Sequence, residues 1–214
     1  MTSDPQATHA LLSSTLAVTL LDTTEQADVC ALLDWMTAAG CVTEDGHPHR
    51  VMSLTLLLAE GLSLLGNASA RRTAIRAGLL HDVGKALVPA ALLSKPGLLS
   101  PAERRVIEQH APLGARLAAS YPGIETDVLD AVRHHHEQYG GLGYPSGLIG
   151  LEIPQLARIL SVADVYDALT SDRPYRAAWS HDEARRHLQQ HAGEMFDPQV
   201  VAAFAVLTDS VPPG

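Results

Sequence analysis

The sequence is poor in cysteine and has no long apolar run. Its two cysteines, Cys30 and Cys41, are too few for a disulfide framework and do not form a CxxC metal clip, so we expect both to be small buried hydrophobic residues. The most apolar early stretch, LLSSTLAVTLL, is too short for a membrane span and follows no basic segment. These absences argue against a membrane protein and a secretory signal, and they predict a cytoplasmic protein.

Basic residues are also scarce. The chain has 15 Lys and Arg against 24 Asp and Glu, and its formal net charge of −9 argues against a general binder of nucleic-acid polymers or membranes. A small anionic substrate is not excluded, because it needs only local positive charge. Only two basic residues are lysines, Lys85 and Lys95, and both lie in HDVGKALVPAALLSKPG.

Strand signals are weak as well. Aromatic residues make up 4% of the chain, whereas Leu and Ala dominate, and leucines recur at helical spacing between Leu54 and Leu65. Ser100, Pro101 and Glu103 have the pattern of a capped helix start. Further helices are predicted over 124–136, 153–170 and 180–192, with glycine- and proline-rich loops between helices. The sequence therefore predicts an all-α fold.

The N-terminal part of the chain predicts one or two helices, over residues 11–21 and 25–40. We interpret residues 1–40 as a helical extension that packs on the main domain, which spans residues 41–214.

Histidine is abundant, with eleven residues. Four of them are expected to be solvated surface groups: His9, His181, His187 and His191. Other histidines and two acids fall near helix ends or on helix faces: His47, His81, Asp82, His110, His135, His136 and Asp164. Imidazole suits Fe, Mn, Zn, Co and Ni, and a carboxylate can bridge two ions. The pattern predicts a helical metal site, and the lack of cysteine argues against a structural zinc finger.

Six segments in a fixed order carry a family resemblance. They are GHPHRV (46–51), LLHDVGKALVPAALLSKPGLLSPAE (79–103), QHAPLGARL (109–117), HHEQYGGLGYPSGLIGLEIP (135–154), ARILSVADVYDALTSDRPYRAAWS (157–180) and GEMFDPQVV (193–201). Over roughly residues 40–206 the chain resembles the HD-GYP family, a branch of the HD phosphohydrolase superfamily, with Gly143-Tyr144-Pro145 as the signature. The resemblance implies an HD-domain helical bundle with a GYP loop.

The resemblance also implies a function. It implies a metal-dependent phosphodiesterase that hydrolyses the bacterial signalling molecule cyclic di-GMP to linear pGpG or onward to GMP. It implies two divalent transition-metal ions, Fe or Mn before Ni, Co or Zn. The expected partner is the small-molecule substrate, with no nucleic-acid polymer and no membrane, and a regulatory protein partner or a homo-oligomer is possible.

The resemblance assigns roles residue by residue. Asp82 would bridge the two ions and belong to the catalytic centre together with Lys85, which would contact the phosphate. One ion would be held by His47, His81 and Asp164, and the other by His110, His135 and His136. Further substrate contacts would come from Tyr144, Arg173 and Arg176. His134 is then the extra histidine of HHH, and Asp167 stays open between a supporting role and a surface acid.

Two positions depart from the family pattern. Thr43 stands where some members have a glutamate associated with a third metal, so a two-metal site is favoured. Gly140 stands where many members have Asp or Asn. Two alternatives stay open: a non-catalytic module that binds cyclic dinucleotides or a protein partner, and an HD phosphohydrolase for another cyclic dinucleotide.

Overall fold

The computed structural model describes residues 21–41, 46–172 and 177–209. These residues form helices and contain no strand beyond an isolated bridge between Ala192 and Phe196. In chain order the helices are α3 (Thr23–Ala38), α4 (His47–Gly61), α5 (Ala68–Leu80), the short 3-10 helix η1 (Val83–Leu87), α6 (Ala90–Leu93), α7 (Pro101–Glu108), α8 (His110–Ala118), α9 (Thr126–His134), the 3-10 helix η2 (Gly150–Glu152), α10 (Gln155–Thr170), α11 (His181–Gln190) and α12 (Pro198–Asp209). The all-α prediction is confirmed.

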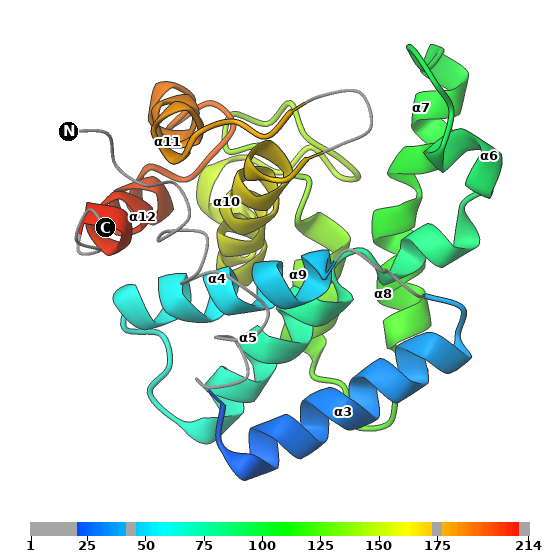
Figure 1. The fold of residues 1–214 in the computed structure, drawn as a ribbon, viewed down its shortest axis with the longest axis vertical. Coiled ribbons are helices and arrows are strands. Elements are labelled where there is room, and N and C mark those ends of the chain that lie inside the picture. Colours follow the sequence, from blue (N-terminus) through cyan, green and yellow to red (C-terminus); the bar gives the residue numbers. More distant parts are fainter. Residues whose placement is uncertain (1–20, 42–45, 173–176, 210–214) are drawn as a thin grey trace.

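Helices α4, α5, α9 and α10 form the core that carries the candidate site. Helix α4 packs along α5, and α10 packs against both α4 and α9 (Figure 1). The contact surfaces are apolar and buried, and they include Leu54, Leu58, Ile75, Leu79, Ile159 and Leu160. Because burying aliphatic side chains is the main favourable term in folding, this packing holds the ends of the four helices in fixed relative positions.

The leucine-rich helix is shorter than the leucine spacing predicts. Helix α4 ends at Gly61 rather than continuing to Leu65. Ser63 has a φ of 59°, in the left-handed region, which an α-helix cannot continue through.

A close approach of η1 to α8 depends on Gly84. A Cβ atom at this position would lie 1.9 Å from the backbone oxygen of His110 and 2.7 Å from the Cα atom of Gly114. Only glycine fits so close to another backbone segment. The glycine of the HDVGK segment thus brings Asp82, which immediately precedes η1, next to the start of α8.

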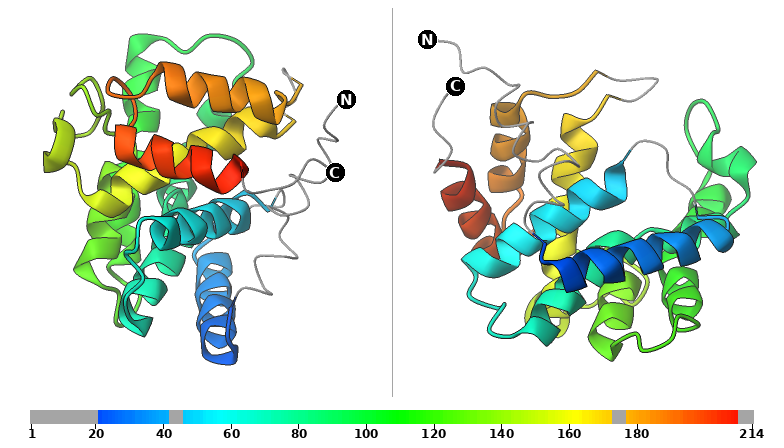
Figure 2. Two further views of the ribbon diagram at one scale, coloured as in Figure 1. Left: turned by 90° about the vertical axis from the view of Figure 1, so that its left-hand side faces the viewer. Right: turned by 60° about the horizontal axis from the view of Figure 1, so that its bottom comes forward.

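Helix α3 lies against the core on the side of α5 (Figure 2). It buries Val29, Leu32 and Met36, and Asp22 begins it with a capping box. The helix predicted over 25–40 is therefore confirmed, whereas the helix predicted over 11–21 lies almost wholly outside the described residues. The expectation for Cys30 is wrong, because α3 turns this side chain to solvent while Val29 faces the core.

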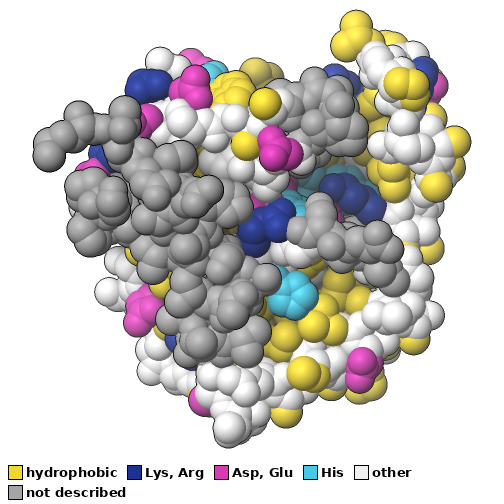
Figure 3. All heavy atoms as spheres, in the orientation of Figure 1, with side chains coloured by type: hydrophobic (Ala, Val, Ile, Leu, Met, Phe, Trp, Pro, Cys, Tyr) yellow, Lys and Arg dark blue, Asp and Glu magenta, His cyan; other side chains and the backbone are white. Residues whose placement is uncertain are grey.

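Helices α6 and α7 project from the rest of the molecule (Figure 1). The predicted helix start at Ser100 is confirmed, since its side chain accepts a hydrogen bond from the Glu103 N–H and the Glu103 side chain accepts one from the Ser100 N–H. Exposed apolar side chains in and beside these helices include Leu87, Leu93 and Leu98. Figure 3 shows hydrophobic side chains gathered over the same region. No helix in the described part of the chain is long and apolar enough to span a membrane.

Candidate metal centre

Three histidines at helix boundaries are oriented in the same way. His81 follows the last residue of α5, His110 begins α8, and His135 follows the last residue of α9. The Nδ1 atom of each lies 2.7–2.8 Å from the carbonyl oxygen three residues earlier. A carbonyl can only accept a hydrogen bond, so Nδ1 carries a proton in each ring, and Nε2 is the atom that can offer a lone pair to a metal ion. Carbonyls at helix ends are free for this bond because they lack intrahelical partners.

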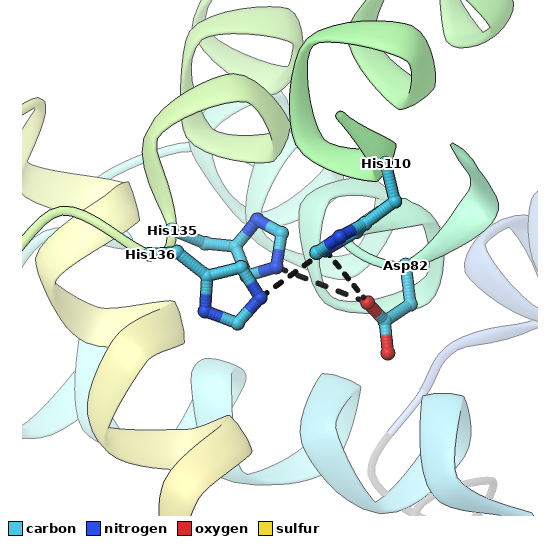
Figure 4. Close-up of side chains that lie close together, drawn as sticks. All are labelled: Asp82, His110, His135 and His136. Atoms are coloured by element: carbon cyan, nitrogen blue, oxygen red, sulfur yellow. Dashed lines mark hydrogen bonds and ion pairs between the residues drawn. The ribbon is translucent and has the colours of Figure 1, made fainter. Parts of the chain in front are cut away.

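The Asp82 carboxylate lies between two groups of histidines. Its Oδ2 atom is 3.5 Å from Nε2 of His47 and 3.4 Å from Nε2 of His81. Its Oδ1 atom is 3.3 Å from Nε2 of His110 and 3.9 Å from Nε2 of His135. Figure 4 shows Asp82 facing His110, His135 and His136. One carboxylate therefore faces both groups, with a different oxygen toward each.

Two groups of ligand atoms are close enough to hold a metal ion. One comprises Asp82, His110, His135 and His136, the other His47, His81 and Asp82, and within each group the atoms lie within 4.8 Å of one another. Asp164 extends the second group from α10, with Oδ1 3.4 Å from Nε2 of His47. All seven ligands expected from the sequence are thus brought together.

The donor atoms fit a cation. Asp82 Oδ1 and His135 Nε2 are buried and have no hydrogen-bond partner among the described residues. Both are acceptors, since the proton of His135 is on Nδ1. Buried polar atoms without partners cost free energy, and two acceptors that face each other repel. A metal ion would satisfy both atoms, which is the feature of this cluster that best fits metal binding.

The protonation states differ between the two groups. Burial and the neighbouring His81 lower the pKa of His135 to about 3, and burial together with His135 lowers the pKa of His136 well below its usual value. Burial would also lower the pKa of His47, but Asp167, Asp82 and Asp164 outweigh it and raise this pKa to about 10. Burial opposes ionisation of Asp82, yet Lys85 and His81 hold its pKa well below the usual value, so the carboxylate is charged.

His47 is oriented by a carboxylate instead of a carbonyl. Its Nδ1 atom lies 2.7 Å from Oδ2 of Asp167, and Arg50 donates to both oxygens of that carboxylate at 2.6 and 3.0 Å. Asp167 is therefore a supporting residue behind His47, not a surface acid. Sequence reasoning missed Arg50, although its position three residues after His47 puts both on one helix face.

The other predicted site residues have distinct positions. Lys85 forms an ion pair with Asp82 and keeps 46% of its side chain exposed. The Tyr144 ring lies 4.9 Å from the His136 ring, centroid to centroid. His134 points elsewhere, with Nδ1 2.9 Å from the Asp130 carbonyl oxygen, as expected for the extra histidine. Arg173, Arg176 and Thr43 lie outside the described residues.

Three of the histidines expected to be plain surface groups, His181, His187 and His191, lie away from the cluster but are only half-exposed. His181 Nδ1 is 3.0 Å from the hydroxyl of Tyr166, and the His187 and His191 rings pack 4.3 Å apart. The solvated surface role predicted for these three is thus only partly correct, and His9 lies outside the described residues.

Gly140 is explained by close packing. A Cβ atom here would lie 3.1 Å from the carbonyl oxygen of Glu194, which accepts the Gly140 N–H bond at 2.7 Å. An Asp or Asn at this position would require Glu194 to shift by a few tenths of an ångström.

The described residues form an all-α domain, and side chains from several of its helices meet in one cluster of His and Asp. The chain belongs to the HD domain family, which it matches over residues 35–200. It is 42% identical over 168 residues to a cyclic di-GMP phosphodiesterase of Pseudomonas aeruginosa, covering 78% of this chain and 40% of the relative. It is also 42% identical to a cyclic di-GMP phosphodiesterase response regulator of Xanthomonas campestris, covering 72% and 41%.

A third relative is specific for a different cyclic dinucleotide. The chain is 36% identical to a 3'3'-cGAMP-specific phosphodiesterase of Vibrio cholerae, over 78% of this chain and 36% of that one. The chain thus spans about two fifths of the length of the curated relatives it matches.

Solved structures support the fold. An HDGYP protein from Bdellovibrio bacteriovorus superposes with a TM-score of 0.61 at 22% identity, over 78% of this chain and 53% of that chain. A cyclic GMP-AMP-specific phosphodiesterase from Vibrio cholerae gives 0.58 at 19%, over 78% and 45%. The resemblance inferred from the ordered motifs is confirmed.

Proposed function

We propose that this chain is a metal-dependent phosphodiesterase that hydrolyses cyclic di-GMP to linear pGpG or onward to GMP. The observation that carries the proposal is the Asp82 carboxylate, which faces two groups of ligand atoms and has a buried Oδ1 atom without a hydrogen-bond partner among the described residues. The relatives from Pseudomonas and Xanthomonas, which are cyclic di-GMP phosphodiesterases, support the choice of substrate.

Two divalent ions fit the two groups. His47, His81 and Asp164 would hold one ion, His110, His135 and His136 the other, and Asp82 would contact both. Fe or Mn suits this imidazole and carboxylate set, as do Ni, Co and Zn. When bound, the ions would neutralise the charge of the phosphodiester and activate water for in-line attack.

The other residues of the site would hold the substrate. Lys85 lies beside Asp82 and is exposed enough to contact a phosphate oxygen. Burial and the nearby Glu108 raise the pKa of Tyr144, so its hydroxyl stays protonated and can donate a hydrogen bond. Arg173 and Arg176 would add positive charge for the phosphate or guanine groups. In Figure 3 histidine side chains are visible in a hollow beside Lys or Arg side chains, which suits a small anionic ligand.

The decisive experiment is incubation of the protein with cyclic di-GMP after anaerobic reconstitution with Fe(II) or Mn(II), followed by chromatography of the products. The matched control is Asp82→Asn, which keeps the size of the side chain and removes its charge. We expect pGpG or GMP with the wild type and neither with the variant. Binding without turnover with any of Fe, Mn, Co or Ni would favour the non-catalytic binding module.

A second substrate has specific support. The chain is 36% identical to the 3'3'-cGAMP-specific enzyme of Vibrio cholerae, so 3'3'-cGAMP is the alternative cyclic dinucleotide. The same assay with both substrates at equal concentration distinguishes them by the ratio of their kcat/KM values.

A further inference from the structure

Glu137 is a buried carboxylate for which the proposed mechanism has no role. It follows the paired histidines directly, and the residue is 2% exposed. Its Oε1 atom accepts a hydrogen bond from the Ser146 N–H at 2.7 Å, and its Oε2 atom accepts one from the Leu148 N–H at 3.1 Å. Both donors belong to the GYP loop, just beyond Pro145. The side chain thus joins the end of the histidine helix to the far side of the loop.

The loop backbone also lies directly on this helix end. A Cβ atom at Gly143 would be 2.4 Å from Cα of Glu137 and 2.2 Å from N of Gln138, so only glycine fits. The next residue, Tyr144, donates its N–H to the His136 carbonyl oxygen at 3.2 Å. The loop backbone is therefore bound at Tyr144 through its N–H, and again after Tyr144 through the Ser146 and Leu148 N–H groups.

These attachments determine where the Tyr144 ring stands. It is tilted by 30° to the His136 ring, with centroids 4.9 Å apart, and lies 6.4 Å from the His110 ring in an edge arrangement. We propose that Glu137 is a positioning residue that holds the GYP loop so that the Tyr144 hydroxyl meets the nucleotide beside the metal centre. The proposal rests on the proposed function and deepens it, because it assigns substrate affinity to a buried residue whose carboxylate binds the loop backbone.

The chemistry of the contact calls for a carboxylate. The two N–H donors bind different oxygens, and only a carboxylate offers two acceptors at these places. A glutamine has the same shape but would turn its NH₂ group toward one of the donors. None of the ion pairs within the described residues includes Glu137, so a charge partner does not explain its burial.

The test is a double-mutant cycle on the manganese-loaded full chain with cyclic di-GMP, using Glu137→Ala, Tyr144→Phe and the double variant. We expect Glu137→Ala to raise KM about tenfold, with kcat changed less than about threefold, because a lost pair of buried hydrogen bonds displaces the loop but leaves the metal ligands. Tyr144→Phe should raise KM several-fold alone but less than about twofold in the Glu137→Ala background, since residues that act through each other are not additive.

Two further variants separate positioning from general stability. Glu137→Gln keeps one of the two acceptors and should give an intermediate KM with wild-type metal content. Glu152→Gln is the matched control, because Glu152 is exposed and accepts a single bond from the Ile149 N–H at 3.0 Å in the same segment. It should leave KM unchanged. Metal content by elemental analysis and thermal melting are recorded for every variant.

Several outcomes overturn the proposal while leaving the proposed function intact. The first is a double variant in which the KM increases of Glu137→Ala and Tyr144→Phe simply multiply. The second is a Tyr144→Phe variant with unchanged KM, and the third is loss of metal in Glu137→Gln. If the wild type binds cyclic di-GMP without hydrolysing it, the proposed function fails, and the same cycle is measured on dissociation constants with the same non-additive pattern expected. A wild type that neither binds nor hydrolyses the dinucleotide overturns both.

Discussion

The two halves of the metal centre are held in place in different ways. In the half formed by His110, His135 and His136, two of the three rings are oriented by backbone carbonyls at helix ends. In the half formed by His47, His81 and Asp164, His47 is instead oriented by Asp167, a side chain 120 residues away that Arg50 holds in turn. His81 in this second half is also oriented by a local carbonyl, that of Gly78, so the difference between the halves lies in His47, which depends on the packing of α4 against α10.

The surroundings of the histidines in the two halves differ as well. His47 faces three carboxylates, which raise its pKa to about 10, whereas burial and neighbouring histidines lower the pKa of His135 to about 3. The difference teaches that one His/Asp cluster can place one histidine among carboxylates and another mainly among histidines. Asp82 belongs to both, and each half can be altered separately.

Asp82→Ala is expected to have the largest effect because it damages both halves at once. It removes the carboxylate that faces both groups, so we expect both ions to be lost and activity to fall by about a thousandfold or more. Metal analysis and turnover of cyclic di-GMP check this result. Circular dichroism should show an unchanged helical fold, and a variant that keeps two tightly bound ions would contradict the shared role of Asp82.

His135→Ala and His136→Ala should each damage one half only. Each should reduce the occupancy of one ion and lower activity by about a hundredfold or more, because the proposed mechanism needs both ions. His134→Ala is the matched control from the same run of three, and its metal content should be near that of the wild type, since its ring lies outside the cluster. If His134→Ala loses metal as completely as His136→Ala, the assignment of the two ligands is wrong.

Asp167→Asn tests the half that depends on tertiary packing. An asparagine keeps the shape but weakens the bonds from His47 and Arg50, so we expect the affinity for one ion to fall by about ten- to a hundredfold, as is usual for residues behind a metal ligand. Titration with Mn(II) would measure this loss. Arg50→Lys should have a similar but smaller effect, because lysine cannot donate two parallel bonds to one carboxylate. Unchanged affinities in both variants would show that His47 needs no support.

Tyr144→Phe should have the smallest effect and should leave both halves intact. The ring packing against His136 and His110 is kept, and only the hydroxyl is lost, so we expect wild-type metal content and a several-fold rise in KM for cyclic di-GMP. Steady-state kinetics and metal analysis measure the two quantities. Loss of metal from this variant would mean that the GYP loop supports the ions directly.

The sequence predicted more of the site than of the helix boundaries. The seven expected ligands do lie together, because the family motifs mark residue types and helix ends that are local in the chain. Helix α4 stops before Leu65 and Cys30 is exposed, since leucine spacing does not locate a helix end and a cysteine in an amphipathic pattern can face either way. The proposed division into residues 1–40 and 41–214 stays a prediction.

By itself the sequence determined the all-α class, the family, and the histidines and aspartates that gather in one cluster. It could do so because capping residues, glycines at close approaches and His or Asp at helix ends act over a few neighbouring positions. Only the tertiary structure decided that Asp167 and Arg50 stand behind His47, and that Glu137 binds the GYP loop instead of an ion. The physical reason is that a buried carboxylate takes whichever donors the packing of distant helices and loops brings within about 3 Å, and no local pattern specifies that choice.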